Sequence, residues 1–304
     1  MASKYKQLQI TITGGAKSGK TTIMKNIGEH LGIYSLSTGD LFRCHAYIWM
    51  NTELPITAVE ERFKELKNAY IYVGGNHEYF YKQKNITDDI DTLEMSSVTC
   101  GLAKNPRFRK IVKDKIAKII RKHRQIIIEG RDTGSKILPN AQLKIYIEHD
   151  YESRVKNCST HTKRESLYSM LVWRDKVDSE REIDPFVKPE GAIIFNNSYI
   201  SKDSAAKLLL QNVVLPKLDE LNIATKNYQP TSPVPYDEKA VVQDVEIESK
   251  EQKQEPAYKT AKSIKSSSES KGITISGKDE ESKVTVTAKG HKQYKQIKVK
   301  KISL

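Results

Sequence analysis

The chain has 304 residues and a formal net charge of +13, which suits partners that carry many negative charges, either nucleotides or nucleic acid. Its three cysteines, Cys44, Cys100 and Cys158, are odd in number and lie far apart in the sequence, which argues against a disulfide framework and favours a reducing compartment. The first residues lack the apolar core of a signal peptide, and no apolar run approaches the ~20 residues that cross a bilayer. We therefore expect a cytoplasmic protein that does not enter the membrane.

Residues 8–22 predict a phosphate-binding loop between a strand and a helix. The run Ile10 to Thr13 alternates as a strand does, and apolar residues at helical spacing follow the loop. Between them stands Gly14-x4-Gly19-Lys20-Thr21, which is the P-loop pattern in its proper context. Glycines let backbone N–H groups turn toward phosphate oxygens, and the helix N-terminus adds partial positive charge.

This loop predicts the ATP-binding residues. They are Gly14, Gly15, Ala16, Lys17, Ser18, Gly19, Lys20, Thr21 and Thr22. Lys20 would reach the β- and γ-phosphates, and the Thr21 hydroxyl would bind Mg²⁺.

The next part of the chain predicts a short strand and then a lobe of mixed structure. Residues 33–37 are typical of a buried strand, and Thr38 opens a helix that carries Arg43. Residues 52–68 are expected to be helical. Two strand-like runs about a glycine turn, 69–73 and 77–81, predict a hairpin, and residues 85–89 are expected to lead into a third short extended piece. Two further helices are expected at 93–102 and, after Asn105-Pro106, at 107–120.

Strands and helices alternate again from residue 125. Residues 125–128 form a continuous apolar strand that ends in Glu129-Gly130-Arg131-Asp132, and the carboxyl end of such a strand is where ligands bind in open α/β sheets. The other expected elements are strands at 143–147 and 192–195, a helix from Asp150, a polar loop at 158–162, a helix from Glu165 that runs on to Arg181, and an amphipathic helix at 204–221.

This order predicts an α/β domain over residues 1–228, a parallel sheet with helices on both faces, with an inserted lobe at about 40–105. Residues 229–304 are rich in Lys, Ser and Glu, and we expect a mostly disordered tail because it has little apolar surface to bury. Three stretches near its end, beginning at Ile273, Lys283 and Ile297, alternate at the strand period. The basic end, from His291, could bind nucleic acid, but such tails are more often merely solvated.

The first ~220 residues resemble a bacterial-type cytidylate kinase, a member of the nucleoside monophosphate kinase fold. Four motifs carry the resemblance: Gly14…Gly19-Lys20-Thr21; Ser37-Thr38-Gly39…Phe42-Arg43; Glu129-Gly130-Arg131-Asp132-Thr133-Gly134; and Arg174-Asp175-x-x-Asp178-x-x-Arg181…Pro185-x-x-Lys188-Pro189. The last two are more particular to cytidylate kinases. Adenylate kinases carry an Asp-Gly-Phe-Pro-Arg motif, which this sequence lacks.

The resemblance implies ATP-dependent phosphorylation of CMP or dCMP in pyrimidine nucleotide metabolism, with Mg²⁺ and in-line transfer that depends on positioning and charge neutralisation. The implied CMP-binding residues are Thr38, Arg43, Cys100, Arg109, Arg131, Asp132 and Asp178. Lys20, Arg174 and Arg181 are the implied catalytic residues, and Glu129 would organise the Mg²⁺ waters beside Thr21. We expect a monomer.

Three departures from the family pattern keep alternatives open. Cys100 stands where a serine commonly contacts the cytosine, so Thr99 could take that role. Asn157-Cys158 replaces an expected arginine pair, with Lys156, Lys163 or Arg164 as candidate substitutes. Lys17 stands where the P-loop usually has a small residue, and could help bind phosphate or clash with it. A kinase for another nucleoside monophosphate, or a catalytically impaired nucleotide-binding protein that acts through its tail, therefore remains an alternative.

Overall fold

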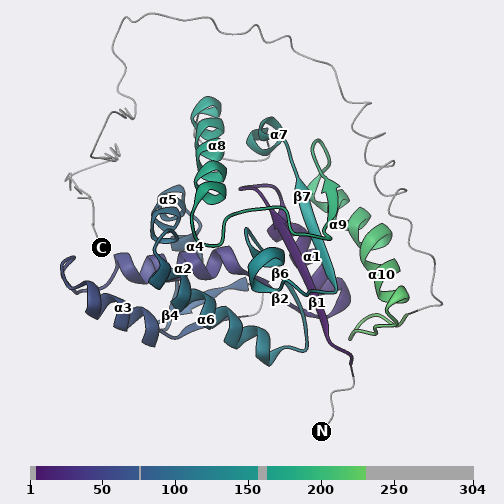
Figure 1. Cartoon of the computed structure of the whole chain (residues 1–304), viewed down its shortest axis with the longest axis horizontal. Coiled ribbons are helices and arrows are strands. Elements are labelled where there is room, and N and C mark those ends of the chain that lie inside the picture. Colours follow the sequence, from purple (N-terminus) through teal and green to yellow (C-terminus); the bar gives the residue numbers. More distant parts are fainter. Residues whose placement is uncertain (1–4, 75–76, 157–162, 231–304) are drawn as a thin grey trace, which may run out of the picture. The chain divides into compact units, whose positions relative to one another are not determined.

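The computed structural model describes residues 5–74, 77–156 and 163–230. Predictions for the loop at 158–162, for Asn157-Cys158 and for the tail beyond residue 230 lie outside the described residues. The central sheet has five parallel strands in the order β2-β6-β1-β7-β8, as Figure 1 shows for most of them. These are β1 (Leu8–Gly14), β2 (Tyr34–Ser37), β6 (Gln125–Gly130), β7 (Leu143–Glu148) and β8 (Ile193–Asn196). The predicted parallel sheet is confirmed.

Helices cover both faces of this sheet, and the strands contribute apolar side chains to each face. In β6, Ile127 joins the apolar cluster of one face, whereas Ile126 and Ile128 join that of the other. The first cluster contains α1 (Lys20–Leu31), α9 (Lys202–Leu209) and α10 (Leu215–Glu220), and the second contains α2 (Thr38–Met50) and α6 (Pro106–Lys122). These two sets lie on opposite sides of the strands in Figure 1.

The inserted lobe combines short helices with a small antiparallel sheet in the order β3-β4-β5. Its elements are α3 (Val59–Asn68), β3 (Ile71–Val73), β4 (Tyr79–Tyr81), β5 (Lys84–Asn85), α4 (Thr87–Ile90) and α5 (Leu93–Leu102). The predicted hairpin is confirmed. The helix expected from residue 52 begins only at Val59, because Pro55 disfavours helix before it and Arg62 binds the carbonyls of Trp49 and Pro55.

The last third of the domain differs from the sequence prediction at one helix boundary and in one turn of a helix. After α7 (Tyr151–Lys156), helix α8 (Arg164–Glu180) ends before Arg181, whose backbone is extended, so the expected helix does not include Arg181. The helix expected at 204–221 is present as a continuous helical run from Lys202 to Glu220, in which a π-helical turn, Leu210–Val214, lies between α9 and α10. Among the described residues, no helix has both the length and the apolar composition of a membrane span.

Candidate active site

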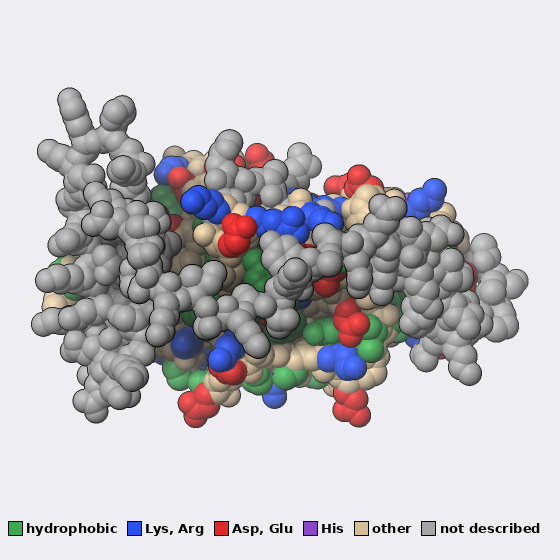
Figure 2. Space-filling view, turned by 90° about the horizontal axis from the view of Figure 1, so that it is seen from above, with side chains coloured by type: hydrophobic (Ala, Val, Ile, Leu, Met, Phe, Trp, Pro, Cys, Tyr) green, Lys and Arg blue, Asp and Glu red, His purple; other side chains and the backbone are tan. Residues whose placement is uncertain are grey.

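The predicted functional residues gather where three neighbouring parallel strands end. Strand β1 continues into the P-loop, β2 ends at Ser37, and β6 ends at Glu129-Gly130, just before Arg131. Because the strands are parallel, their carboxyl ends share one edge of the sheet. This edge lies toward α7 and α8 in Figure 1, and the face seen from above in Figure 2 carries a band of Lys and Arg side chains with Asp and Glu nearby.

The P-loop is held by its own conformation and by the residues that directly follow strands β7 and β8. Gly19 has φ of 86°, which glycine adopts without strain. The Ser18 carbonyl accepts a hydrogen bond from Asn197 Nδ2 at 2.9 Å, and His149 Nδ1 lies 3.4 Å from the same oxygen. Lys17 also has a positive φ, 54°, and its ammonium lies 3.9 Å from Asp91 of the inserted lobe.

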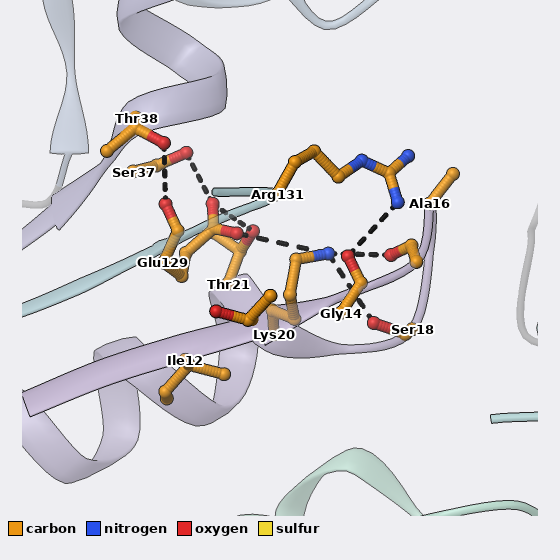
Figure 3. A network of polar contacts seen from close by, with 12 residues as sticks. Ile12, Gly14, Ala16, Ser18, Lys20, Thr21, Ser37, Thr38, Glu129 and Arg131 are labelled. Atoms are coloured by element: carbon orange, nitrogen blue, oxygen red, sulfur yellow. Dashed lines mark hydrogen bonds and ion pairs between the residues drawn. The ribbon is translucent and has the colours of Figure 1, made fainter. Parts of the chain in front are cut away.

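Lys20 lies inside this loop with its ammonium buried (Figure 3). Its Nζ donates to the Gly15 carbonyl at 2.6 Å and is 3.9 Å from Glu129 Oε2. Burial lowers the pKa of Lys20 to about 7, although Glu129 opposes this shift. An anionic phosphate bound beside the ammonium would raise that pKa again.

The two residues predicted to hold a metal, Thr21 and Glu129, are in contact. Thr21 Oγ1 donates to Glu129 Oε1 at 3.2 Å, and Ser37 Oγ donates to the same oxygen at 2.5 Å (Figure 3). Ser37 also caps helix α2 by accepting the Asp40 N–H. The sequence prediction gave Ser37 no role in the site, although its position in the Ser37-Thr38-Gly39 motif was a signal.

The turn after β6 is fixed by hydroxyl groups. Thr38 Oγ1 donates to the Glu129 carbonyl at 2.9 Å, and a Cβ at Gly130 would lie only 2.2 Å from that hydroxyl oxygen, so this approach requires glycine. On the other side, Thr133 Oγ1 donates to the Ile12 carbonyl at 3.2 Å. These bonds set the direction in which Arg131 and Asp132 leave the sheet.

Four residues from the predicted set meet around the Asp178 carboxylate. Arg131 Nε lies 2.9 Å from Asp178 Oδ2, and Arg181 Nη1 donates to Oδ1 at 3.1 Å. The Cys100 thiol donates to the same Oδ1 at 3.8 Å. By contrast, the Thr99 hydroxyl donates to the Met95 carbonyl of its own helix at 2.6 Å. Cys100, and not Thr99, therefore contacts the Asp178 carboxylate.

Arg109 forms a second, deeply buried centre with Asp132. Arg109 Nη2 donates to Asp132 Oδ2 at 2.5 Å, and its Nε donates to Asp184 Oδ2 at 3.2 Å. Only 2% of the Arg109 surface is exposed, and all three of its side-chain nitrogens have protein acceptors. Burial raises the pKa of Asp132, although Arg109 and Arg181 oppose the shift.

The remaining predicted arginines, Arg43 and Arg174, lie in the same electrostatic neighbourhood. Arg43 is paired with Asp40, which also accepts the Tyr79 hydroxyl at 3.0 Å. Burial, followed by repulsion from Arg131, lowers the pKa of Arg174 to about 10. Arg174 therefore lies close enough to Arg131 for the two charges to repel, although burial is the larger cause of the shift.

Each of four arginines retains one buried nitrogen without a hydrogen-bond acceptor in the described structure. These atoms are Arg43 Nε, Arg131 Nη2, Arg174 Nε and Arg181 Nη2. Buried donors are normally paired, because an unpaired one costs about 1–3 kcal/mol. Such a group of guanidinium donors suits a ligand with several anionic oxygens.

Asp175, which had no predicted role, also belongs to the site. Asp175 accepts the Ala16 N–H of the P-loop at 2.9 Å and pairs with both Arg131 and Arg154. Arg164, one candidate substitute for the altered arginine pair, instead pairs with Glu152 on the surface. Asp175 stands in a motif that the sequence prediction quoted, but its neighbours Arg174 and Asp178 were given the roles.

A family model and curated relatives point to the same family. The family model described as cytidylate kinase matches residues 10–214. The chain belongs to this family. The cytidylate kinase of Thermosipho melanesiensis is 32% identical over 213 residues, which cover 67% of this chain and 96% of the relative, and that of Mycoplasma genitalium is 30% identical, covering 67% and 95%. The cytidylate kinase of Aquifex aeolicus is 28% identical with the same coverages.

Proposed function

We propose that this cytidylate kinase family member transfers the γ-phosphoryl group of ATP to CMP or dCMP. The observation that carries the proposal is the cluster of four arginines with unpaired buried donors beside the P-loop lysine. Phosphoryl transfer between two nucleotides brings several anionic groups together and depends on neutralising their charge. A site that only bound one nucleotide would not need so many converging cations.

We assign the residues the roles that the resemblance to cytidylate kinases implies. Lys20, Arg174 and Arg181 neutralise the transferred phosphoryl group. The acceptor phosphate is held by Arg43 and Arg131, whose planar forks suit bidentate contacts. The resemblance also assigns Arg109 to this phosphate, and Arg109 would have to release one of its protein acceptors to reach it. Thr38 supports these arginines through its bond to β6. Asp132 and Asp178 accept the pentose hydroxyls, and Cys100 meets the base.

Mg²⁺ fits the oxygen atoms that lie next to the P-loop. Thr21 supplies a hydroxyl and Glu129 a carboxylate, and these hard oxygen ligands are what Mg²⁺ prefers when it also keeps waters and phosphates. Thr21 would hold the ion directly, and Glu129 would orient its waters. When bound, the ion would supply positive charge that helps neutralise the phosphate oxygens of ATP.

We place the ATP nucleoside in a cavity of about 630 Å³ near the P-loop. Arg154 and Asp175, which contact the loop, line this cavity together with His149, Asn196 and Ser198. Its volume lies within the usual range for small-molecule sites. The mixture of ring, amide and hydroxyl groups suits a base and a ribose.

A coupled assay of ADP formation with CMP, dCMP, UMP and AMP tests the proposal. Phosphorylation of CMP or dCMP well above the other acceptors is expected, and Lys20→Met should abolish it without unfolding the protein. Lys25→Met, which removes a half-buried ammonium from the same helix, is the matched control and should retain activity. Preference for UMP or AMP would contradict the assigned substrate, and equal activity of Lys20→Met would contradict the P-loop assignment.

A further inference from the structure

Asp175 joins the P-loop to two arginines through both oxygens of its carboxylate. Oδ1 accepts the Ala16 N–H at 2.9 Å and lies 2.8 Å from Arg131 Nη1, while Oδ2 pairs with Arg154 Nη1. The residue is 6% exposed and projects from helix α8. A single carboxylate therefore connects the loop, the end of β6 and helix α7.

The close approach depends on the absence of a side chain at Gly15. A Cβ built there would lie 2.4 Å from Arg154 Nη1 and 2.6 Å from Asp175 Oδ2. Gly15 does not have a positive φ, so the backbone conformation does not require glycine. Its lack of a side chain instead makes room for the Asp175–Arg154 pair on the loop.

The carboxylate offers the same interactions that a phosphate would offer. Burial tends to raise the pKa of Asp175, but Arg131 and Arg154 outweigh it and hold the pKa below the ordinary value, so the group is ionised at neutral pH. Backbone N–H groups and guanidinium groups are the usual donors to phosphate oxygens. A phosphate bound in this loop would compete with Asp175 for these donors.

Arg131 connects this contact to the other half of the site. Its Nη1 also donates to the Gly14 carbonyl at 3.0 Å, while its Nε lies 2.9 Å from Asp178 Oδ2. Asp178 lies on the side assigned to CMP. A change in the Asp175–Arg131 contact is therefore transmitted to the acceptor side by one rigid guanidinium group.

We infer that Asp175 is a positioning residue that couples ATP binding to CMP binding. The phosphates of ATP take over the Ala16 N–H and Arg154 from Asp175, which weakens its hold on Arg131 and frees that arginine for the acceptor phosphate. Because linkage is reciprocal, CMP also strengthens ATP binding. This inference rests on the proposed function for the identity of the two ligands.

Calorimetry on the full chain tests the coupling. The dissociation constant of a non-hydrolysable ATP analogue is measured with and without CMP, and tripolyphosphate is titrated alone. For the unaltered protein we expect CMP to tighten analogue binding on the order of tenfold, and for Asp175→Asn by less than about twofold. Asp175→Asn should also bind tripolyphosphate several-fold more tightly, because one competing negative charge is removed.

Asp184→Asn is the matched control. Asp184 also bridges two cations, Arg109 at 3.2 Å and Lys113 at 2.8 Å, and all of its described ion pairs are with these two. It should weaken CMP binding but preserve the coupling ratio. Thermal unfolding checks each variant; if Asp175→Asn does not fold, Gly15→Ala displaces the carboxylate sterically and should also reduce the coupling.

An unchanged coupling ratio in the folded variant, or weaker tripolyphosphate binding, would overturn the inference and leave Asp175 a purely structural role. Absence of coupling in the unaltered protein would overturn it as well. If the unaltered protein binds another monophosphate instead of CMP, the proposed substrate is wrong, but the same measurements with that nucleotide still test the role of Asp175.

Discussion

Cys100 Sγ lies 3.8 Å from Asp178 Oδ1, although the two residues are 78 positions apart in the sequence. Burial, followed by the charge of Asp178, raises the pKa of the thiol to about 11, so it remains protonated and acts as the donor at neutral pH. A thiol is a weak hydrogen-bond donor. The Asp178 carboxylate therefore has one weak donor, the Cys100 thiol, and two stronger donors, the guanidinium groups of Arg131 and Arg181.

Cys100→Ser should preserve or raise the catalytic efficiency for CMP, by up to a few-fold. A hydroxyl is a stronger donor than a thiol and can serve both Asp178 and a bound base. Steady-state kinetics with CMP as the varied substrate measures the effect. Cys44→Ser is the control, because Cys44 is fully buried in an apolar cluster and should lose stability instead. A large loss of activity in Cys100→Ser would show that the sulfur is needed for packing.

Asp178→Ala and Arg131→Ala should separate the two halves of the site. Asp178→Ala should raise KM for CMP by at least about tenfold and leave ATP affinity largely unchanged, because the described bonds of its carboxylate go to Cys100, Arg131 and Arg181. Arg131→Ala should weaken both substrates, since Arg131 also contacts Gly14 and Asp175. Dissociation constants for ATP and CMP, measured separately, check this. If Asp178→Ala weakens the binding of ATP alone, the two substrates have been assigned to the wrong sides of the site.

Arg131 is expected to affect both substrates because of contacts that the sequence alone does not reveal. The motif after β6 placed Arg131 at the carboxyl end of a parallel strand, and the structure has it there. Its three partners come from β1 and α8, more than forty residues away in either direction. Spacing along the chain sets which edge of the sheet a residue occupies, but packing of distant elements sets the direction of its side chain.

The strands and the P-loop were predictable because their signals are local. Alternation, apolar runs and glycine spacing each depend on neighbouring residues. The role of Asp175 was not predictable in this way, because its contacts with Ala16 and Arg154 depend on how α8 meets β1 and α7. The π-helical turn between α9 and α10 was also missed, since an amphipathic pattern runs through it unchanged.

The efficiency of the enzyme with ATP should fall as pH rises above about 7. Burial lowers the pKa of Lys20 to about 7, and bound phosphate favours the charged form, so the pKa is higher in the complex. Below pH 7 the lysine is charged in both states. Above it, binding must take up a proton, and kcat/KM for ATP should fall about tenfold per pH unit, whereas kcat stays nearly constant.

Lys20→Arg tests the assignment of this pH dependence, because an arginine remains charged at pH 9. Its activity should be lower, but the decrease of kcat/KM between pH 7 and 9 should disappear. If kcat/KM for Lys20→Arg still decreases above pH 7, a group other than Lys20 causes the pH dependence.

Lys17→Gly should stabilise the protein by about 0.5–1 kcal/mol. Lys17 has φ of 54°, a left-handed conformation that costs a non-glycine residue roughly 1–2 kcal/mol, part of which the greater freedom of unfolded glycine offsets. Its ion pair with Asp91 is at 3.9 Å and largely exposed, so its loss matters little. Urea unfolding measures the change. Lys67→Gly in helix α3 is the control and should destabilise the protein by about 1 kcal/mol. If both variants change the free energy of unfolding in the same direction, the backbone of Lys17 is not strained.

Truncation after Pro230 should leave kinase activity and thermal stability nearly unchanged. The Lys-, Ser- and Glu-rich composition of the removed tail gives it little apolar surface to bury against the enzyme. The residues just before the cut are attached to the domain. Thr225 Oγ1 donates to the Leu31 carbonyl at 2.6 Å, and Tyr228 donates to Asp219 at 2.7 Å.

Truncation after Leu221 is the matched comparison, because it removes these contacts and also Ile223, which is 4% exposed in the apolar cluster around α1. It should lose about 2–5 kcal/mol of stability through the loss of this buried side chain and the bonds at the end of α1. Thermal unfolding and the ADP assay on both truncations give the answer. If the cut after Pro230 also lowers activity or melting temperature, the tail contributes to the folded enzyme, and the boundary at residue 228 is wrong.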